Sequence, residues 1–125
     1  MPSVVKAAVA YVVPVFAVAF LLGALRVTLV APVTGPLFAV ALEVPVVLLL
    51  SWAVAGRVLA RWPLPRTPRL AMGALAFALL MLAEFATALG FGQTPTAFLA
   101  AMNTPAGALG LAGQIGFGLI PVLRR

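Results

Sequence analysis

Residues 36–61 read PLFAVALEVPVVLLLSWAVAGRVLAR, and this stretch decides the fold. Residues 36–60 are apolar and long enough to cross a bilayer as a helix, which takes about 20 such residues. Pro36 suits the first helical position, because its missing N–H has no helical partner there. The stretch also contains Glu43, and a carboxylate in hydrocarbon is costly unless it is paired, protonated or facing water. Glu43 is therefore a functional-site candidate.

Three further apolar stretches predict helices of the same kind. They cover approximately residues 4–31, 68–90 and 105–121. Pro32 is expected to end the first, because the residue before a proline is biased away from helical backbone angles. Thr67 is expected to cap the third helix. The fourth is expected to end before Pro121.

Two signals between the third and fourth stretches predict a short additional helix. Thr94-Pro95 and Thr104-Pro105 each combine a capping hydroxyl with a proline at the first helical position. The helix expected over residues 96–102 is too short to span, so we expect it to lie along the membrane surface. A length of 125 residues fits one domain, residues 1–125. The predicted fold is an all-α four-helix transmembrane bundle with this interfacial helix before the last span.

The composition favours a membrane protein and excludes several other classes. Apolar residues make up 65% of the chain and charged residues 8%, against roughly a quarter charged in soluble domains. The chain has no cysteine or histidine, which excludes disulfides, Cys/His zinc sites and the usual haem ligands. We predict no catalytic residues, no metal site and no cofactor. Binding of a carotenoid or quinone, which needs no such ligand, stays open.

The basic residues predict the orientation of the chain. The formal charge is +6, and all but one of the eight lysines and arginines border the same side of the predicted spans. By the positive-inside rule that side is cytoplasmic, which predicts both termini inside and a place in a bacterial inner membrane. The expected partners of these charges are anionic lipid headgroups rather than nucleic acid. The residues are Lys6, Arg57, Arg61, Arg66, Arg69, Arg124 and Arg125.

Three charged residues, Arg26, Glu43 and Glu84, lie inside predicted spans. They are five, seven and six residues from the expected outer ends of their helices. At about 1.5 Å per residue, all three lie roughly 7–11 Å below the outer boundary. We therefore expect them to meet in the bundle, with one carboxylate paired with the guanidinium and the other neutral.

Two interpretations of these three residues stay open. A proton shared between two buried carboxylates beside an arginine is the chemistry of a proton-coupled site. Alternatively, an ion pair and a neutral glutamic acid fix the helix packing and never move, because polar groups hold small membrane bundles together.

Three other residues are assigned supporting roles. Pro45, two residues after Glu43, frees the carbonyl of Ala41 and provides either a hinge or a static kink. Gln114 is expected deeper than the charged residues, where it extends a polar path inward or hydrogen-bonds a neighbouring helix. Thr87 lies three residues after Glu84.

The fourth stretch is rich in small residues, which let helix backbones approach closely in lipid. Whether they pack inside the bundle, against a second copy in a homo-oligomer or against a larger membrane complex stays open. The predicted helix-packing residues are Gly107, Ala108, Gly110, Ala112 and Gly116.

The segments Arg26-Val27, Glu43-Val44-Pro45 and Ser51-Trp52 resemble small, uncharacterised four-helix inner-membrane proteins of bacteria. This resemblance implies a fold and carries no function. Small multidrug resistance transporters are of similar size, but they use a glutamate in the first span, where this chain has none. Two functional hypotheses follow. One is a proton- or cation-linked transport protein for a small solute, and the other is a non-catalytic accessory or assembly subunit of a larger membrane complex.

Overall fold

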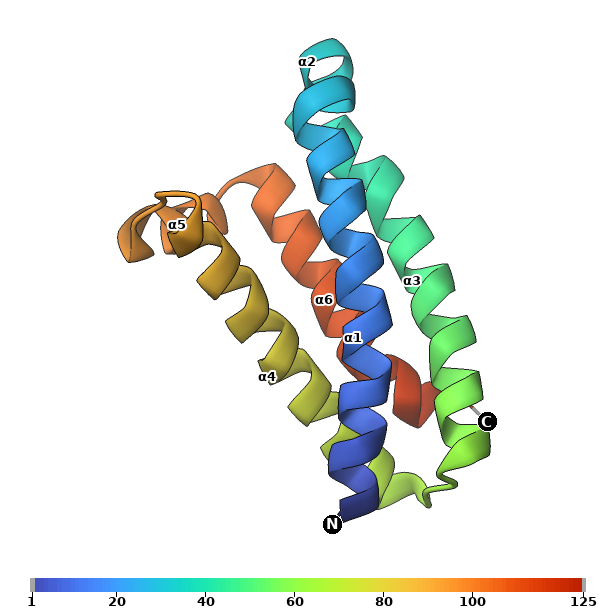
Figure 1. The fold of residues 1–125 in the computed structure, drawn as a ribbon. Coiled ribbons are helices and arrows are strands. Elements are labelled where there is room, and N and C mark those ends of the chain that lie inside the picture. The colour runs from blue at the N-terminus through green and yellow to red at the C-terminus, as the bar shows by residue number, and fades with distance from the viewer. Residues whose placement is uncertain (1, 125) are drawn as a thin grey trace.

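The computed structural model describes residues 2–124, and its secondary structure over that range is helical, without strands (Figure 1). The first helical run contains a short π-helical segment, and a short helix precedes the last long one. The elements are α1 (Pro2–Leu25), η1 (Arg26–Val30), α2 (Ala31–Thr34), α3 (Pro36–Arg61), α4 (Arg66–Gly90), α5 (Pro95–Ala101) and α6 (Pro105–Leu123).

Four helical runs are long and apolar enough to cross a membrane, by length and composition. Large apolar side chains such as Leu21, Leu49 and Leu82 are more than 60% exposed on the outside of the bundle. Such a surface is suited to lipid rather than to water. The predicted bundle of membrane-spanning helices is confirmed at this level. The runs are Ser3–Thr34, Pro36–Arg61, Arg66–Gly90 and Pro105–Leu123.

The prediction that Pro32 ends the first helix is wrong. The helix continues through η1 and α2 to Thr34, and Gly35 ends it with a φ of 88°. In η1 the N–H of Ala31 bonds to the carbonyl of Arg26, five residues back instead of four. This wider turn accommodates the ring of Pro32, which would clash with a carbonyl in a regular α-helix. Glycine ends the helix because it adopts a positive φ without strain.

Two other helix ends also differ from the prediction. Thr67 does not cap α4, which begins at Arg66 with Pro65 as its N-cap. Pro68 fits inside the first turn, where a proline displaces no helical hydrogen bond. The fourth helix does not end before Pro121 but contains it and continues to Leu123.

The two predicted threonine caps around the short helix are present. The hydroxyls of Thr94 and Thr104 each accept a hydrogen bond from the backbone N–H three residues later, at 3.1 and 3.0 Å. The helix between them, α5, agrees with the prediction over residues 96–102 to within a residue. Phe98 of α5 packs edge-on against Phe85 of α4, with ring centroids 5.1 Å apart.

The long helices form a four-membered ring in which α3 contacts α1 and α6, and α4 contacts the same two helices. The start of α1, the α3–α4 connection and the end of α6 lie at one end of the bundle (Figure 1). We call this the basic end, and the opposite end, with α2 and α5, the neutral end. Arg125, which the sequence also assigns to the basic side, lies outside the described residues. The described residues of the basic end are Lys6, Arg57, Arg61, Arg66, Arg69 and Arg124.

The buried apolar core fills the half of the bundle next to the basic end. It includes Tyr11, Val15, Met72 and Phe117, whose side chains have no exposed surface. Toward the neutral end α4 diverges from α1 (Figure 1), and η1, α2 and α5 contribute no buried residue. Arg26, Glu43, Glu84 and Gln114 are in this loosely packed half, whereas Tyr11 and Ser51 are buried in the other half.

A tyrosine of α1 satisfies a carbonyl that a proline of α6 leaves without a donor. Pro121 has no N–H, so the carbonyl of Phe117, four residues earlier, lacks its helical partner. The hydroxyl of Tyr11 donates to this carbonyl at 2.6 Å. The rings of Tyr11 and Phe117 also stack, with centroids 4.3 Å apart and an interplanar angle of 7°. This contact explains why α6 continues through Pro121.

Glycines bring α6 close to its neighbours. A Cβ built on Gly73 of α4 would overlap the carbonyl oxygen of Gly118, so the two backbones touch. Gly107, one of the predicted packing residues, makes the same kind of contact with the carbonyl of Ala101 at the α5–α6 connection.

The other predicted packing residues fall on two sides of α6. Cβ positions built on Gly110 and Gly116 lie 4.0 and 3.2 Å from the side chains of Val40 and Leu48 on α3. Ala108 and Ala112 are exposed instead, and within residues 2–124 no other helix covers them.

Gly73→Ala is expected to destabilise the bundle, because its methyl group would push α4 away from Gly118. Overpacking costs typically about 1–3 kcal/mol, more than the gain of up to about 1 kcal/mol that alanine has over glycine in a helix. Gly90→Ala is the matched control, since nothing lies within 4 Å of its Cβ position. Thermal unfolding in detergent should show a lower midpoint for Gly73→Ala alone, and equal midpoints would contradict the close contact.

Tyr11→Phe should cost about 1–3 kcal/mol, the penalty for a buried carbonyl without a donor. Pro121→Ala restores a backbone N–H to the carbonyl of Phe117, so the tyrosine substitution should cost less in that background. Unfolding free energies of the four proteins in mixed micelles measure this coupling. Strictly additive effects would show that Tyr11 does not serve that carbonyl.

Candidate functional site

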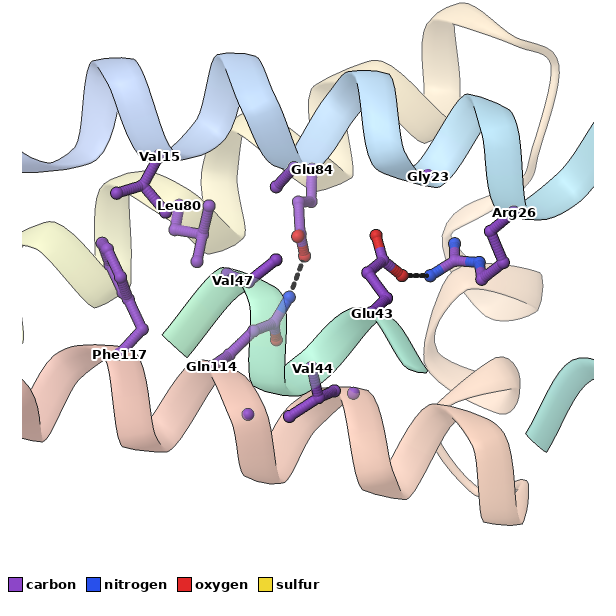
Figure 2. A pocket seen from close by; sticks show the side chains of 13 residues that line it. Val15, Gly23, Arg26, Glu43, Val44, Val47, Leu80, Glu84, Gln114 and Phe117 are labelled. Atoms are coloured by element: carbon purple, nitrogen blue, oxygen red, sulfur yellow. Dashed lines mark hydrogen bonds and ion pairs between the residues drawn. The ribbon is translucent and has the colours of Figure 1, made fainter. Parts of the chain in front are cut away.

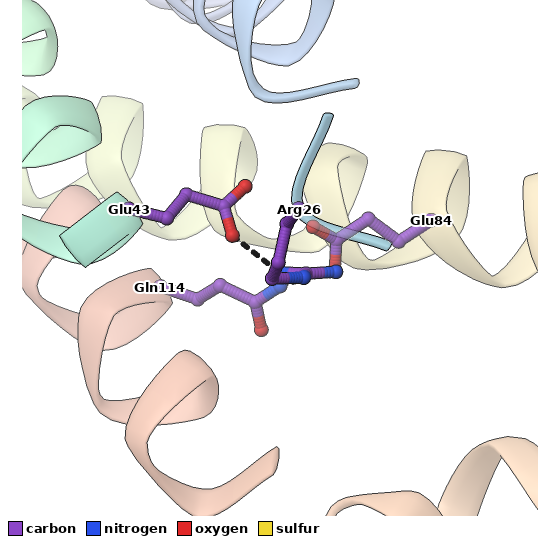
Figure 3. Close-up of polar contacts among 4 residues, drawn as sticks. All are labelled: Arg26, Glu43, Glu84 and Gln114. Atoms are coloured by element: carbon purple, nitrogen blue, oxygen red, sulfur yellow. Dashed lines mark hydrogen bonds and ion pairs between the residues drawn. The ribbon is translucent and has the colours of Figure 1, made fainter. Parts of the chain in front are cut away.

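The ion pair of the site joins the first helical run to α3. Arg26 is the first residue of η1, the π-helical turn. Its guanidinium donates to Oε2 of Glu43, and the two form an ion pair (Figures 2 and 3). The side chain of Arg26 is 32% exposed and that of Glu43 is 13% exposed. Gly23 lies beside the pair, and a Cβ at its position would be in ordinary van der Waals contact with Nη2 of Arg26, at 3.7 Å.

Glu84 on α4 has a different partner. Its Oε2 accepts a hydrogen bond from the side-chain amide of Gln114 on α6 (Figure 2). Within residues 2–124 Glu84 is in no ion pair. The structure therefore arranges the predicted site residues as two polar pairs, Arg26 with Glu43 and Glu84 with Gln114.

Both pairs line one cavity of about 140 Å³ inside the bundle, and all four long helices contribute to its wall. Figure 2 shows Glu43 between Arg26 on one side and Glu84 with Gln114 on the other. The charged residues are thus spread along the bundle, whereas the sequence predicted a common depth. The reason is that α2 carries the first helix beyond the level at which α4 ends (Figure 1).

A larger groove of about 640 Å³ adjoins this cavity between α1 and α4. The two spaces share Arg26, Glu84 and Gln114 in their walls. The groove extends to Phe91 and Gln93, just after α4, where Phe91 is 79% exposed. The polar cavity is therefore next to a groove that reaches the surface toward the neutral end.

The cavity is closed in the other direction. Toward the basic end its wall is made of Val15, Leu80 and Phe117, all of them buried. A further space of about 220 Å³, between α4, α5 and α6, again has Glu84 and Gln114 in its wall. This second polar pair is thus common to all three spaces, and it lies above a closed apolar floor.

The two remaining predicted supporting residues lie outside the cavity. Pro45 lines an apolar groove between α3 and α6, together with Trp52. Thr87 lines the groove between α1 and α4, and its hydroxyl donates to the carbonyl of Ala83 at 2.7 Å.

Several residues that line the cavity were not predicted as site residues from the sequence. Gly113 is one, and its Cβ position lies 3.0 Å from Cγ1 of Val44 on α3. Phe117 could have been found, because a proline inside a span leaves a carbonyl four residues earlier that needs an external donor. Pro121 provides that signal, and the single tyrosine of the chain, Tyr11, is an obvious donor.

The arrangement can bind a proton or a cation. Glu43 is neutralised by Arg26, whereas an ionised Glu84 has only the neutral amide of Gln114 as a partner. An ionisable side chain inside a span is a functional-site candidate by default, because charge there is costly. No group of three or more His, Cys, Asp or Glu residues within the described range could hold a metal ion.

Fold and site together define a multi-pass membrane protein with a polar cavity in the half of its bundle away from the basic end. No family model, curated protein or solved structure matches the chain.

Removing one partner of the ion pair should cost more than removing both. Arg26→Met leaves Glu43 without its countercharge, and Glu43→Gln leaves the guanidinium unpaired, whereas the double variant leaves neither charge. We expect a coupling of about 1–3 kcal/mol in a double-mutant cycle of unfolding free energies. A control cycle pairs Arg26→Met with Thr34→Val, whose hydroxyl bonds only to neighbouring backbone, and should be additive. If the free-energy changes are additive in both cycles, Arg26 and Glu43 do not form a stabilising ion pair.

Proposed function

We propose that this protein is a proton- or cation-linked transport protein for a small solute, with its site at Glu84, Gln114 and the Arg26–Glu43 pair. One observation carries the proposal. Both acids of the chain line a single cavity, and that cavity adjoins a groove leading to the neutral end. A structural lock would need contacts between the charged groups but no such space.

The two acids have different roles in this proposal. Arg26 compensates the charge of Glu43, so the pair is neutral as a unit and positions the wall of the cavity. The charge of Glu84 is compensated only when the group takes up a proton or a cation. Binding of a cation at Glu84 therefore competes with protonation, which is the coupling that proton exchange requires.

The proposed setting is a bacterial inner membrane with both termini in the cytoplasm. The basic residues at one end of the bundle support this orientation through the positive-inside rule. The groove then faces the outside, α5 lies along the outer surface, and the arginines of the basic end contact anionic lipid headgroups.

A second candidate function is that of an accessory subunit in a larger membrane complex. The exposed Ala108 and Ala112 of α6 favour it, because small residues four apart let another helix approach closely. Extraction in a mild detergent would then recover the chain with larger partners, and Ala112→Leu would release it. A stable homo-oligomer that Ala112→Leu leaves intact would argue against this function.

Glu84→Gln is expected to abolish pH-driven flux in liposomes, because glutamine neither releases a proton nor carries the charge that binds a cation. Purified protein is reconstituted with a trapped pH dye, an inward or outward pH gradient is imposed, and dissipation is recorded with different cations outside. The Glu84→Gln signal should equal that of protein-free liposomes, while Glu43→Gln should reduce the flux.

The control for this experiment is Thr34→Val, which changes a hydroxyl at the neutral end that lines none of the spaces of the site. Its flux should match that of the unaltered protein. Transport is refuted if the unaltered, folded protein dissipates no gradient with any cation tested, or if Glu84→Gln dissipates it equally well.

A further inference from the structure

The groove between α1 and α4 is lined by aromatic rings along its length. Phe16 and Phe20 come from α1, and Phe91 comes from the residue after α4. The rings of Phe16 and Phe20 have centroids 6.2 Å apart, and those of Phe20 and Phe91 are 6.5 Å apart. The three rings therefore form a continuous row. The faces of aromatic rings carry partial negative charge and attract cations.

The charges around the groove also favour a cation. Its wall contains one guanidinium, that of Arg26, and one carboxylate, that of Glu84. The guanidinium is already paired with Glu43, which lines the inner cavity. One positive and two negative side chains sum to −1 when both acids are ionised. A ligand with a single positive charge brings this sum to zero.

The two spaces differ in the size of ligand that they can hold. The inner cavity of about 140 Å³ holds only water molecules or small ions. The groove of about 640 Å³ falls in the range of sites that hold small organic ligands. The aromatic row and Glu84 border the same groove, so an apolar body and a charged centre can be bound at once.

We propose that this groove binds lipophilic organic monocations, quaternary ammonium or phosphonium ions with an apolar body, and that these are the solute of the transport proposed above. The inference thus rests on the proposed function for its biological meaning. The cation centre lies against Glu84 and the apolar body against the row of Phe16, Phe20 and Phe91. An organic anion would have to displace Glu43 from Arg26 and accept Glu84 as a neighbour, so the groove rejects it.

The test uses two ions of matching shape and opposite charge, tetraphenylphosphonium and tetraphenylborate. Binding of each to purified protein in detergent is measured by equilibrium dialysis, with protein-free micelles as background. We expect saturable binding of the phosphonium and none of the borate. Glu84→Gln should weaken phosphonium binding about thirtyfold or more, as expected for loss of a buried charge partner.

Phe20→Ala should weaken phosphonium binding about threefold to tenfold, through loss of one aromatic face. Phe20 is 42% exposed, so this variant keeps the fold and decides the question even if Glu84→Gln does not fold. Leu21→Ala is the matched control, because Leu21 is 63% exposed on the same helix and does not line the groove.

Three results overturn the inference: no saturable phosphonium binding, equal binding of both ions, or binding that Phe20→Ala leaves unchanged. The inference and the proposed function fail separately. If the protein binds phosphonium but shows no pH-driven flux, the ligand class is supported and transport is refuted. If it shows flux but binds no phosphonium, transport is supported and this ligand class is refuted.

Discussion

The structure depends on one constraint, which is that a polar group inside a bilayer must find a partner within the protein. Every buried side-chain nitrogen and oxygen in residues 2–124 has a hydrogen-bond partner. The hydroxyl of the fully buried Ser51 donates a hydrogen bond to the carbonyl of Val47 at 2.7 Å. Tyr11 donates across the bundle to Phe117. The same requirement brings together the two polar pairs of the cavity, each of which joins two different helices.

The polar groups that need such partners differ between the two halves of the bundle. Near the basic end the helices enclose an apolar core, and Gly73 and Gly118 allow α4 and α6 to touch. Near the neutral end the side chains of Arg26 and Glu84 need space and partners, and the helices separate around a cavity. Packing and polarity thus vary together along the bundle axis, so the site is open on one side and closed on the other.

Long apolar stretches and the caps at Thr94 and Thr104 were enough to predict the number and approximate limits of the helices, because both signals are local, although the cap predicted at Thr67 was wrong. Helix ends at prolines were predicted poorly. Pro32 is tolerated because the preceding turn widens, and Pro121 because Tyr11, 110 positions away in the sequence, lies beside it. Such compensation depends on tertiary contacts that no local pattern contains.

The residues of the candidate site were predictable, and so was an ion pair between Arg26 and one carboxylate, but not which carboxylate it would be. Charge inside an apolar stretch marked Arg26, Glu43 and Glu84 directly. That Glu84 bonds to Gln114 depends on the rotation of α4 relative to α6, which glycine contacts set. The exposure of Ala108 and Ala112 follows from the same rotation, since turning one face of α6 inward turns the other outward.

The stacked rings of Tyr11 and Phe117 close the cavity on its side toward the basic end, where Phe117 itself lines the wall. If the two rings parted, the carbonyl of Phe117 would lose its donor, because Pro121 offers no substitute. That loss of about 1–3 kcal/mol favours the stacked form by about 5- to 150-fold. In the transport cycle that we propose, an opening toward the basic end would therefore be a rare event, separate from access through the groove.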